Sequence, residues 1–118
     1  MRFMCLIHYD EAALAQATPE EMQQFGAAWG AFNEALAKAG NPGERLQPSR
    51  AATTVRGIKG RTEILDGPYA DTKEQFAGYF MLDVADLDAA IEFAKSCPGV
   101  RYGSIEIRPF WQPPAGQG

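Results

Sequence analysis

The fold is organised around one stretch, Leu65-Asp66-Gly67-Pro68-Tyr69-Ala70-Asp71-Thr72-Lys73-Glu74-Gln75-Phe76-Ala77-Gly78, which lies between two apolar runs. Gly67 and Pro68 predict a tight turn at the end of a strand, because glycine frees the backbone and proline fixes φ. Asp71 and Glu74 have the spacing of a capping box, which predicts a short helical turn before the next strand. We therefore expect this corner to hold polar side chains close together.

Strands are predicted on both sides of the corner. Residues 2–8 and 77–84 are largely apolar at both alternating positions, which is typical of central strands covered on both faces. Residues 104–109 alternate isoleucine with charged side chains and predict a strand nearer an edge. Residues 52–56 and 61–65 predict a hairpin across a glycine-containing turn, and residues 44–47 a short additional strand.

Two helices are predicted from their caps and apolar spacing. Thr18 is a favourable N-cap with Glu21 three residues later, and apolar side chains recur at steps of three and four across residues 22–36. Gly40 marks the end of this helix. Asp86 caps the second helix, which ends before Pro98. Residues 12–17 predict only a loop or weak turn.

This order of elements predicts an α+β ferredoxin-like sandwich with an extra β-hairpin. Two helices cover one face of such a sheet, so the other face, with Met4 and Leu6, needs a second cover. A second copy of the chain is the simplest one, which predicts a homodimer. We expect a single domain over residues 1–111 and a flexible tail, rich in proline and glycine, over residues 112–118.

Composition excludes several classes of function. The 118 residues, 46% of them hydrophobic, suffice for one domain with a core. The net charge of −4 argues against a nucleic-acid partner, which would require a cationic face. The cations in the predicted hairpin are interpreted as a solvated edge. Residues 3–7 are too short an apolar run for a signal peptide or a membrane span, so we expect a cytoplasmic protein without a membrane partner.

The residues that bind metals and cofactors are sparse. Cys5 and Cys97 are too few for a disulfide framework and are interpreted as reduced thiols. His8, Asp10 and Glu11 are too close in sequence to form a complete ligand set, so no metal site is predicted. No glycine-rich phosphate loop occurs, and no cofactor is predicted.

His8 is the candidate catalytic residue. It is the single histidine, it ends the first predicted strand, and it can titrate near neutral pH as a general acid or base. The alternative is a histidine packed at a strand end. Asp66 is its candidate partner, because both residues end strands of one predicted sheet; alternatively, its carboxylate accepts amides of its own turn.

Further side chains are predicted to contact a ligand near these two. Tyrosines offer hydroxyls or stacking, although aromatic side chains near strand ends more often simply pack. Arg108 offers a planar fork for a substrate carboxylate, or an ion pair with Glu106, Asp66 or Glu74. Glu74 is either a capping residue or a second acid. The predicted ligand contacts are Tyr9, Asp10, Tyr69, Lys73, Glu74 and Arg108.

The corner resembles the DGPF-domain proteins of the YCII-related family. Their Asp-Gly-Pro-Phe motif precedes a Thr-Lys-Glu-Gln run and a glycine, and here residues 66–69, 72–75 and 78 match. Tyr69 replaces the phenylalanine and adds a hydroxyl. The resemblance continues from Met1 to about Pro109 through these segments: Met4-Cys5-Leu6-Ile7, Thr18-Pro19-Glu20-Glu21-Met22, Glu44-Arg45-Leu46 and Tyr102-Gly103-Ser104-Ile105-Glu106-Ile107-Arg108-Pro109.

The resemblance implies a dimer of back-to-back sheets of the dimeric α/β barrel type. It also implies, for better-understood relatives, proton transfer by a histidine and an aspartate on small ring or dienone substrates, with the histidine on the first helix. Residues 22–36 contain no histidine, so that pair cannot be transferred, and Asp10 matches the acidic member in position only. Some relatives are encoded beside sigma factors, which implies a transcription-factor partner by analogy.

Two hypotheses follow. The first is a small-ligand-binding or regulatory dimeric module, favoured because no unambiguous catalytic set is present. The alternative is a cofactor-free lyase or isomerase that moves protons on a small ring or enolisable substrate, with His8 and Asp66 as the acid–base pair.

Overall fold

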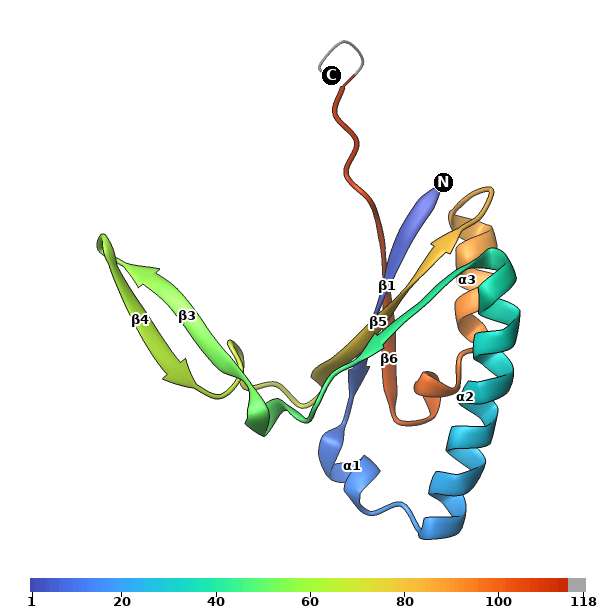
Figure 1. Cartoon of the computed structure of the whole chain (residues 1–118), viewed down its shortest axis with the longest axis horizontal. Helices are drawn as coiled ribbons and strands as arrows, with labels where there is room; N and C mark the ends of the chain where they lie inside the picture. Colours follow the sequence, from blue (N-terminus) through green and yellow to red (C-terminus); the bar gives the residue numbers. More distant parts are fainter. Residues whose placement is uncertain (115–118) are drawn as a thin grey trace.

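The computed structural model describes residues 1–114 of the chain. It is a mixed α+β fold with a four-stranded antiparallel sheet, helices on one face of that sheet, and a separate two-stranded sheet (Figure 1). The elements follow the chain as β1 (Arg2–Tyr9), α1 (Glu11–Ala15), α2 (Pro19–Ala39), β2 (Gly40–Arg45), η1 (Ser49–Ala51), β3 (Thr53–Ile58), β4 (Arg61–Asp66), β5 (Gln75–Asp83), α3 (Leu87–Lys95), η2 (Pro98–Arg101) and β6 (Gly103–Pro109).

The main sheet has the order β2-β5-β1-β6, with every neighbouring pair antiparallel. The prediction that residues 2–8 and 77–84 form the central strands is confirmed, as is the edge position of β6. Phe3 lies opposite Leu82 and Cys5 opposite Phe80, so the apolar positions of the two central strands share one face. This strand order is consistent with the predicted ferredoxin-like sandwich.

The core lies between this face and the helices. Helices α2 and α3 lie on the same side of the sheet (Figure 1), and α2 buries Phe25, Phe32 and Leu36. The predicted capping box is confirmed: Thr18 accepts from the Glu21 amide, and Glu21 accepts from the Thr18 amide. The largest fully buried side chains are Phe3, Phe80, Leu36, Leu82, Cys5 and Cys97.

The opposite sheet face has no helix over it within residues 1–114. Because neighbouring strand residues alternate, Met4 and Leu6 of β1 and Tyr79 and Met81 of β5 project to this face and are half-buried. We call it the open sheet face. None of the helices in the described residues is long and apolar enough to cross a membrane.

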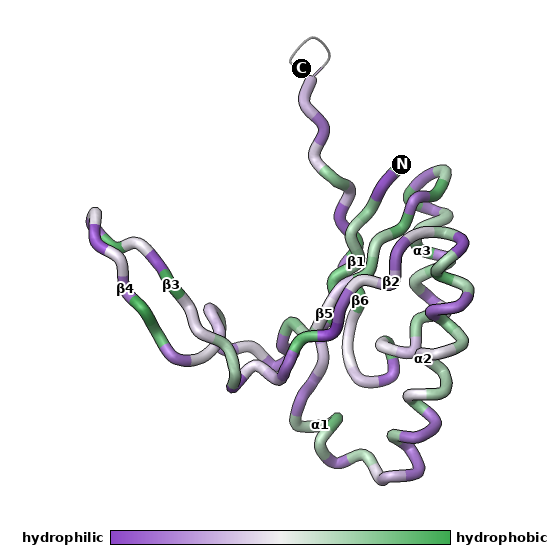
Figure 2. The backbone as a smooth tube through the Cα atoms, in the orientation of Figure 1, coloured by the Kyte–Doolittle hydropathy of each residue, from purple (hydrophilic) through white to green (hydrophobic). Residues whose placement is uncertain are grey.

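The predicted hairpin forms an arm, which we define as β3 and β4 together. Its turn contains Lys59 with φ 50° and Gly60 with φ 79°, a pair of positive φ values that suits a two-residue hairpin. The arm projects away from the body of the protein (Figure 1). Part of β4 is hydrophobic (Figure 2), although every residue of this strand is exposed. Val55 and Ile64 lie opposite each other and are 63% and 73% exposed.

Three local predictions were wrong. Residues 12–17 were expected to form a loop or weak turn, but residues 11–15 form the short helix α1, which Asp10 caps. Residues 40–43 were expected only to stop a helix, but they begin β2. Residues 71–74 were expected to form a helical turn, but residues 71–72 are irregular and residues 73–74 form a bend. The Thr72 hydroxyl donates to the Glu74 carbonyl, 2.5 Å away, and replaces the capping box.

The carboxyl end was predicted to be a flexible tail over residues 112–118. Residues 112–114 have no regular secondary structure, and residues 115–118 lie outside the described part of the chain.

Candidate functional site

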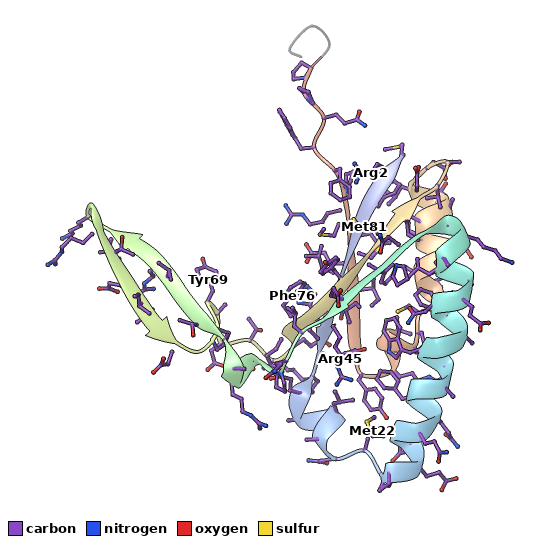
Figure 3. The ribbon with its side chains drawn as sticks, in the orientation of Figure 1. Arg2, Met22, Arg45, Tyr69, Phe76 and Met81 are labelled. Atoms are coloured by element: carbon purple, nitrogen blue, oxygen red, sulfur yellow. The ribbon has the colours of Figure 1, made fainter. Side chains whose placement is uncertain are left out.

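A cavity of about 650 Å³ lies where the arm joins the main sheet, and we call it the junction cavity. Figure 3 shows Tyr69 and Phe76 on the two sides of this junction. Its wall comes from the end of β1, the segment 46–54, the corner after β4 and the start of β5. The lining residues are His8, Leu46, Gln47, Pro48, Ser49, Ala51, Ala52, Thr53, Thr54, Pro68, Tyr69, Ala70, Thr72, Glu74, Gln75 and Phe76.

His8 lies on the sheet side of the junction cavity. It belongs to the open sheet face, because it alternates with the buried Ile7 and Tyr9. Its Nε2 lies 3.2 Å from Oε1 of Glu106, and its ring centroid lies 5.6 Å from that of Phe76. The side chain is 27% exposed. His8 is therefore not enclosed by apolar packing, and its ring is accessible from the cavity.

Glu74 is positioned by a hydrogen bond from the edge strand β6. Ser104 lies directly opposite His8 in the β1–β6 pairing, and its hydroxyl donates to Oε1 of Glu74 over 2.7 Å. Glu106 follows Ser104 by two residues and so lies on the same face. His8, Glu74, Ser104 and Glu106 thus form a polar strip that leads from β6 into the junction cavity.

Hydrogen bonds fix the opposite wall. The Glu11 carboxylate accepts from both the backbone amide and the hydroxyl of Ser49, which ties α1 to η1. The Gln75 side chain accepts from the Glu11 amide over 3.2 Å. At the base of the arm, the Thr54 hydroxyl donates to the Gly67 carbonyl over 2.8 Å. The wall is therefore connected through four segments of the chain.

The lining has a defined electrostatic character. Glu74 is its single carboxylate, His8 is its one imidazole, and none of the lining residues is lysine or arginine. A ligand that donates hydrogen bonds, either neutral or cationic, would therefore be favoured over an anion. Tyr69, 84% exposed, and Phe76 add aromatic surface against which a ring can stack.

The structure brings together three of the residues predicted from the sequence: His8, Tyr69 and Glu74. Asp66 is not among them. It ends β4 in the separate two-stranded sheet, lies opposite Thr53, is exposed, and does not line the junction cavity. The expectation that His8 and Asp66 end strands of one sheet was wrong, because β4 pairs only with β3.

The other predicted contacts are dispersed. Tyr9 projects to the helix side of the sheet and is 6% exposed. Asp10 accepts from the Ala13 amide as the N-cap of α1. Lys73 is exposed, and Arg108 lies opposite Met4 on the open sheet face; neither lines the junction cavity.

Ser104, Glu106 and Phe76 were missed in the sequence. The alternation within β6 and β5 assigns each of these residues to one of the two faces of its strand. It does not show which of the two faces also carries His8. Within residues 1–114 no group of three or more histidine, cysteine, aspartate or glutamate side chains is arranged to hold a metal ion.

A family model for the YCII-related domain matches residues 1–112. The chain belongs to the YCII-related family. It is also similar to an uncharacterized protein of Rhizobium meliloti (strain 1021), with 35% identity over 113 residues that cover 92% of this chain and 91% of the relative. In this YCII-related chain, Pro68 and Tyr69 of the Asp-Gly-Pro-Tyr corner line the junction cavity, whereas Asp66 and Gly67 lie outside its lining.

Proposed function

We propose that this YCII-related chain is a small-ligand-binding module that acts as a homodimer and holds its ligand in the junction cavity. The observation that carries the proposal is the composition of that cavity. It combines about 650 Å³ of space with Glu74, His8 and two exposed aromatic side chains, and small-molecule sites are commonly of this size and mixed character. The ligand would be a small ring compound, neutral or cationic, with hydrogen-bond donors.

The dimer follows from the open sheet face. We propose that the body is a ferredoxin-like sandwich and that this face packs against that of a second copy, as in a dimeric α/β barrel. Met4, Leu6, Tyr79 and Met81 give the face its apolar character. Because His8 shares the face, a second copy would also close one side of the junction cavity. A transcription factor as a further partner rests on the family analogy alone.

Binding can be tested by native mass spectrometry of the purified protein, followed by thermal-shift measurements with ring-containing amines, alcohols and amides. The variant Glu74→Gln removes the charge but keeps the size of the side chain. We expect it to weaken binding about tenfold or more, because hydrogen bonds to charged groups contribute about 1.5–3 kcal/mol.

Lys73→Gln is the matched control, since Lys73 is adjacent, exposed and outside the lining. Equal effects of the two variants would contradict the proposed site. So would the absence of both a copurified compound and any thermal shift from the panel.

A cofactor-free lyase or isomerase is the second candidate. The observation that favours it is the contact between His8 and Glu106, since a carboxylate that orients an imidazole makes it a better general base. His8→Asn keeps a polar side chain of similar shape. If the protein is such an enzyme, this variant should retain ligand binding and dimerisation but lose turnover of the identified ligand. Unchanged turnover would leave binding alone as the function.

A further inference from the structure

A second cavity, of about 450 Å³, lies on the helix side of the sheet, and we call it the helix-side cavity. It is bounded by α1, α2, the end of β1, β2 and the start of β5. The lining residues are Ile7, Tyr9, Leu14, Met22, Phe25, Gly26, Trp29, Asn33, Pro42, Gly43, Glu44, Arg45, Ala77, Gly78 and Tyr79. None of these residues lines the junction cavity.

Strand alternation separates the two cavities. His8 projects to the open sheet face and lines the junction cavity, whereas the next residue, Tyr9, projects to the helix side. The same holds for Phe76 and Ala77 at the start of β5. The helix-side cavity is therefore a distinct site on the opposite face of the same strand ends.

Aromatic side chains form its inner wall. The ring centroids of Tyr9 and Phe25 lie 6.0 Å apart and those of Phe25 and Trp29 lie 6.4 Å apart, both in edge-to-face arrangements. Met22 adds a flexible apolar side chain from the preceding turn of α2. A flat ring or a branched apolar group is the kind of ligand that such a wall can pack against.

Arg45 is the only cation in the lining. It lies opposite the buried Gly78 in the β2–β5 pairing, which places it on the helix side, and Figure 3 shows it on the same side of the sheet as Met22. No carboxylate of residues 1–114 lies within ion-pair distance of it. The preceding residue, Glu44, lies opposite Tyr79, so strand alternation places it on the open sheet face and not on the helix side.

Tyr9 brings a hydroxyl to the same space. Burial raises the pKa of the Tyr9 phenol, and a hydrogen bond with Trp29 and the charge of Arg45 offset part of that rise. The phenol therefore stays protonated at neutral pH, and Tyr9 and Arg45 line the same cavity. A neutral hydroxyl and an unpaired guanidinium together are suited to a carboxylate.

Gly26 keeps the helix-side cavity open. It lies inside α2, where glycine costs about 1 kcal/mol relative to alanine. A Cβ at this position would meet no atom within 4 Å, so close packing does not require glycine here. Gly30, one turn later, is also unobstructed but does not line the cavity. The pair therefore offers a matched comparison.

We propose that the helix-side cavity binds a small aromatic carboxylate, with the ring against Tyr9, Phe25 and Trp29 and the carboxylate held by Arg45. This site is independent of the ligand proposed for the junction cavity, whose lining has no cation suited to an anion. The two cavities would then hold ligands of opposite electrostatic preference on the two faces of one sheet.

Trp29 provides the readout. The chain has two tryptophans, and Trp111 is 81% exposed, so a Trp111→Phe variant leaves Trp29 as the single reporter. We expect benzoate and phenylacetate to change its fluorescence saturably. Benzyl alcohol and benzamide, their neutral counterparts, should bind about tenfold or more weakly, because they lack the charge that Arg45 pairs with.

Two variants separate the charge from the space. Arg45→Gln should reduce the affinity for benzoate to that for benzamide, while Lys38→Gln, which removes an exposed cation of α2 outside the lining, should not change it. Gly26→Leu should abolish binding with the fold retained, and Gly30→Leu should leave binding intact. Millimolar benzoate and phenylacetate without a saturable change, equal binding of the neutral compounds, or equal effects of the two glycine variants would overturn the proposal.

Discussion

Burial suppresses the reactivity of the two cysteine side chains, Cys5 and Cys97. Burial raises the pKa of Cys5 to about 12 and the pKa of Cys97 to about 11. The thiolate is the reactive form, so both thiols should be inert in the folded protein at pH 8. We expect no reaction with an aromatic disulfide reagent under native conditions and reaction of both thiols after unfolding in urea.

The same shifts predict a pH dependence. In the unfolded chain the pKa of each thiol is near 9.0, well below its pKa in the folded protein. The free energy of unfolding should therefore be unaffected by them below about pH 9 and should fall as the pH rises further, because the unfolded state loses its protons first. Rapid labelling of the native protein at pH 8 would contradict this account of the core.

Secondary structure elements were predictable where the signals are local. Thr18 and Glu21 lie three residues apart and satisfy each other's amides, so the start of α2 could be identified from the sequence. The corner before β5 has the same three-residue spacing between Asp71 and Glu74. There, however, the Thr72 hydroxyl and the side-chain amide of Gln75 donate to backbone carbonyls instead. Local spacing alone does not determine which of these competing hydrogen bonds forms.

Elements that depend on distant contacts were less predictable. β2 contains Gly40, Pro42 and Gly43, residue types that are depleted in strands. A Cβ on Gly40 would lie 1.9 Å from the Met81 carbonyl, so the glycine is what permits β2 to lie against β5. The error in pairing His8 with Asp66 has the same origin, because strand pairing is a long-range property.

A similar close approach fixes the start of β6, and it predicts the effect of a substitution there. A Cβ on Gly103 would lie 1.8 Å from the His8 carbonyl oxygen. Gly103→Ala should therefore shift the start of β6 and lower the free energy of unfolding by about 1–3 kcal/mol, as overpacked sites do. It should also displace Ser104 from Glu74. Urea denaturation measures the first effect.

Gly30→Ala is the control for this substitution. Position 30 lies inside α2, and a Cβ added there would meet no atom within 4 Å, so alanine should raise the free energy of unfolding by roughly 0.5–1 kcal/mol. If Gly103→Ala proved as stable as the parent protein, β6 would not be held at the distance that its pairing with β1 implies.

The described residues, 1–114, leave two apolar surfaces without a covering element, one of them half-buried and the other exposed. One is the open sheet face, and the other is the arm with Val55 and Ile64. A two-stranded hairpin alone is at best marginally stable in water, so the arm needs contacts beyond its own strands. The arm has three cations and two carboxylates, whereas the rest of the chain has eight cations and thirteen carboxylates. A second copy offers the open sheet face a matching apolar face, and it offers the net positive arm a net negative body.

We therefore predict a homodimer that buries more than about 1,200 Å² in total, measurable as a dimeric mass by light scattering at micromolar concentration. Leu6 projects to the open sheet face, whereas Leu82 is buried beneath the helices. Leu6→Asp should accordingly produce monomers, because a buried charge without a partner is costly. Val55→Asp should weaken the dimer less, since it affects the arm alone. Leu87→Asp, at an exposed position in the first turn of α3, should leave the dimer intact. A parent protein that is monomeric, or a Leu6→Asp variant that remains dimeric, would mean that the open sheet face is not the surface through which two copies associate.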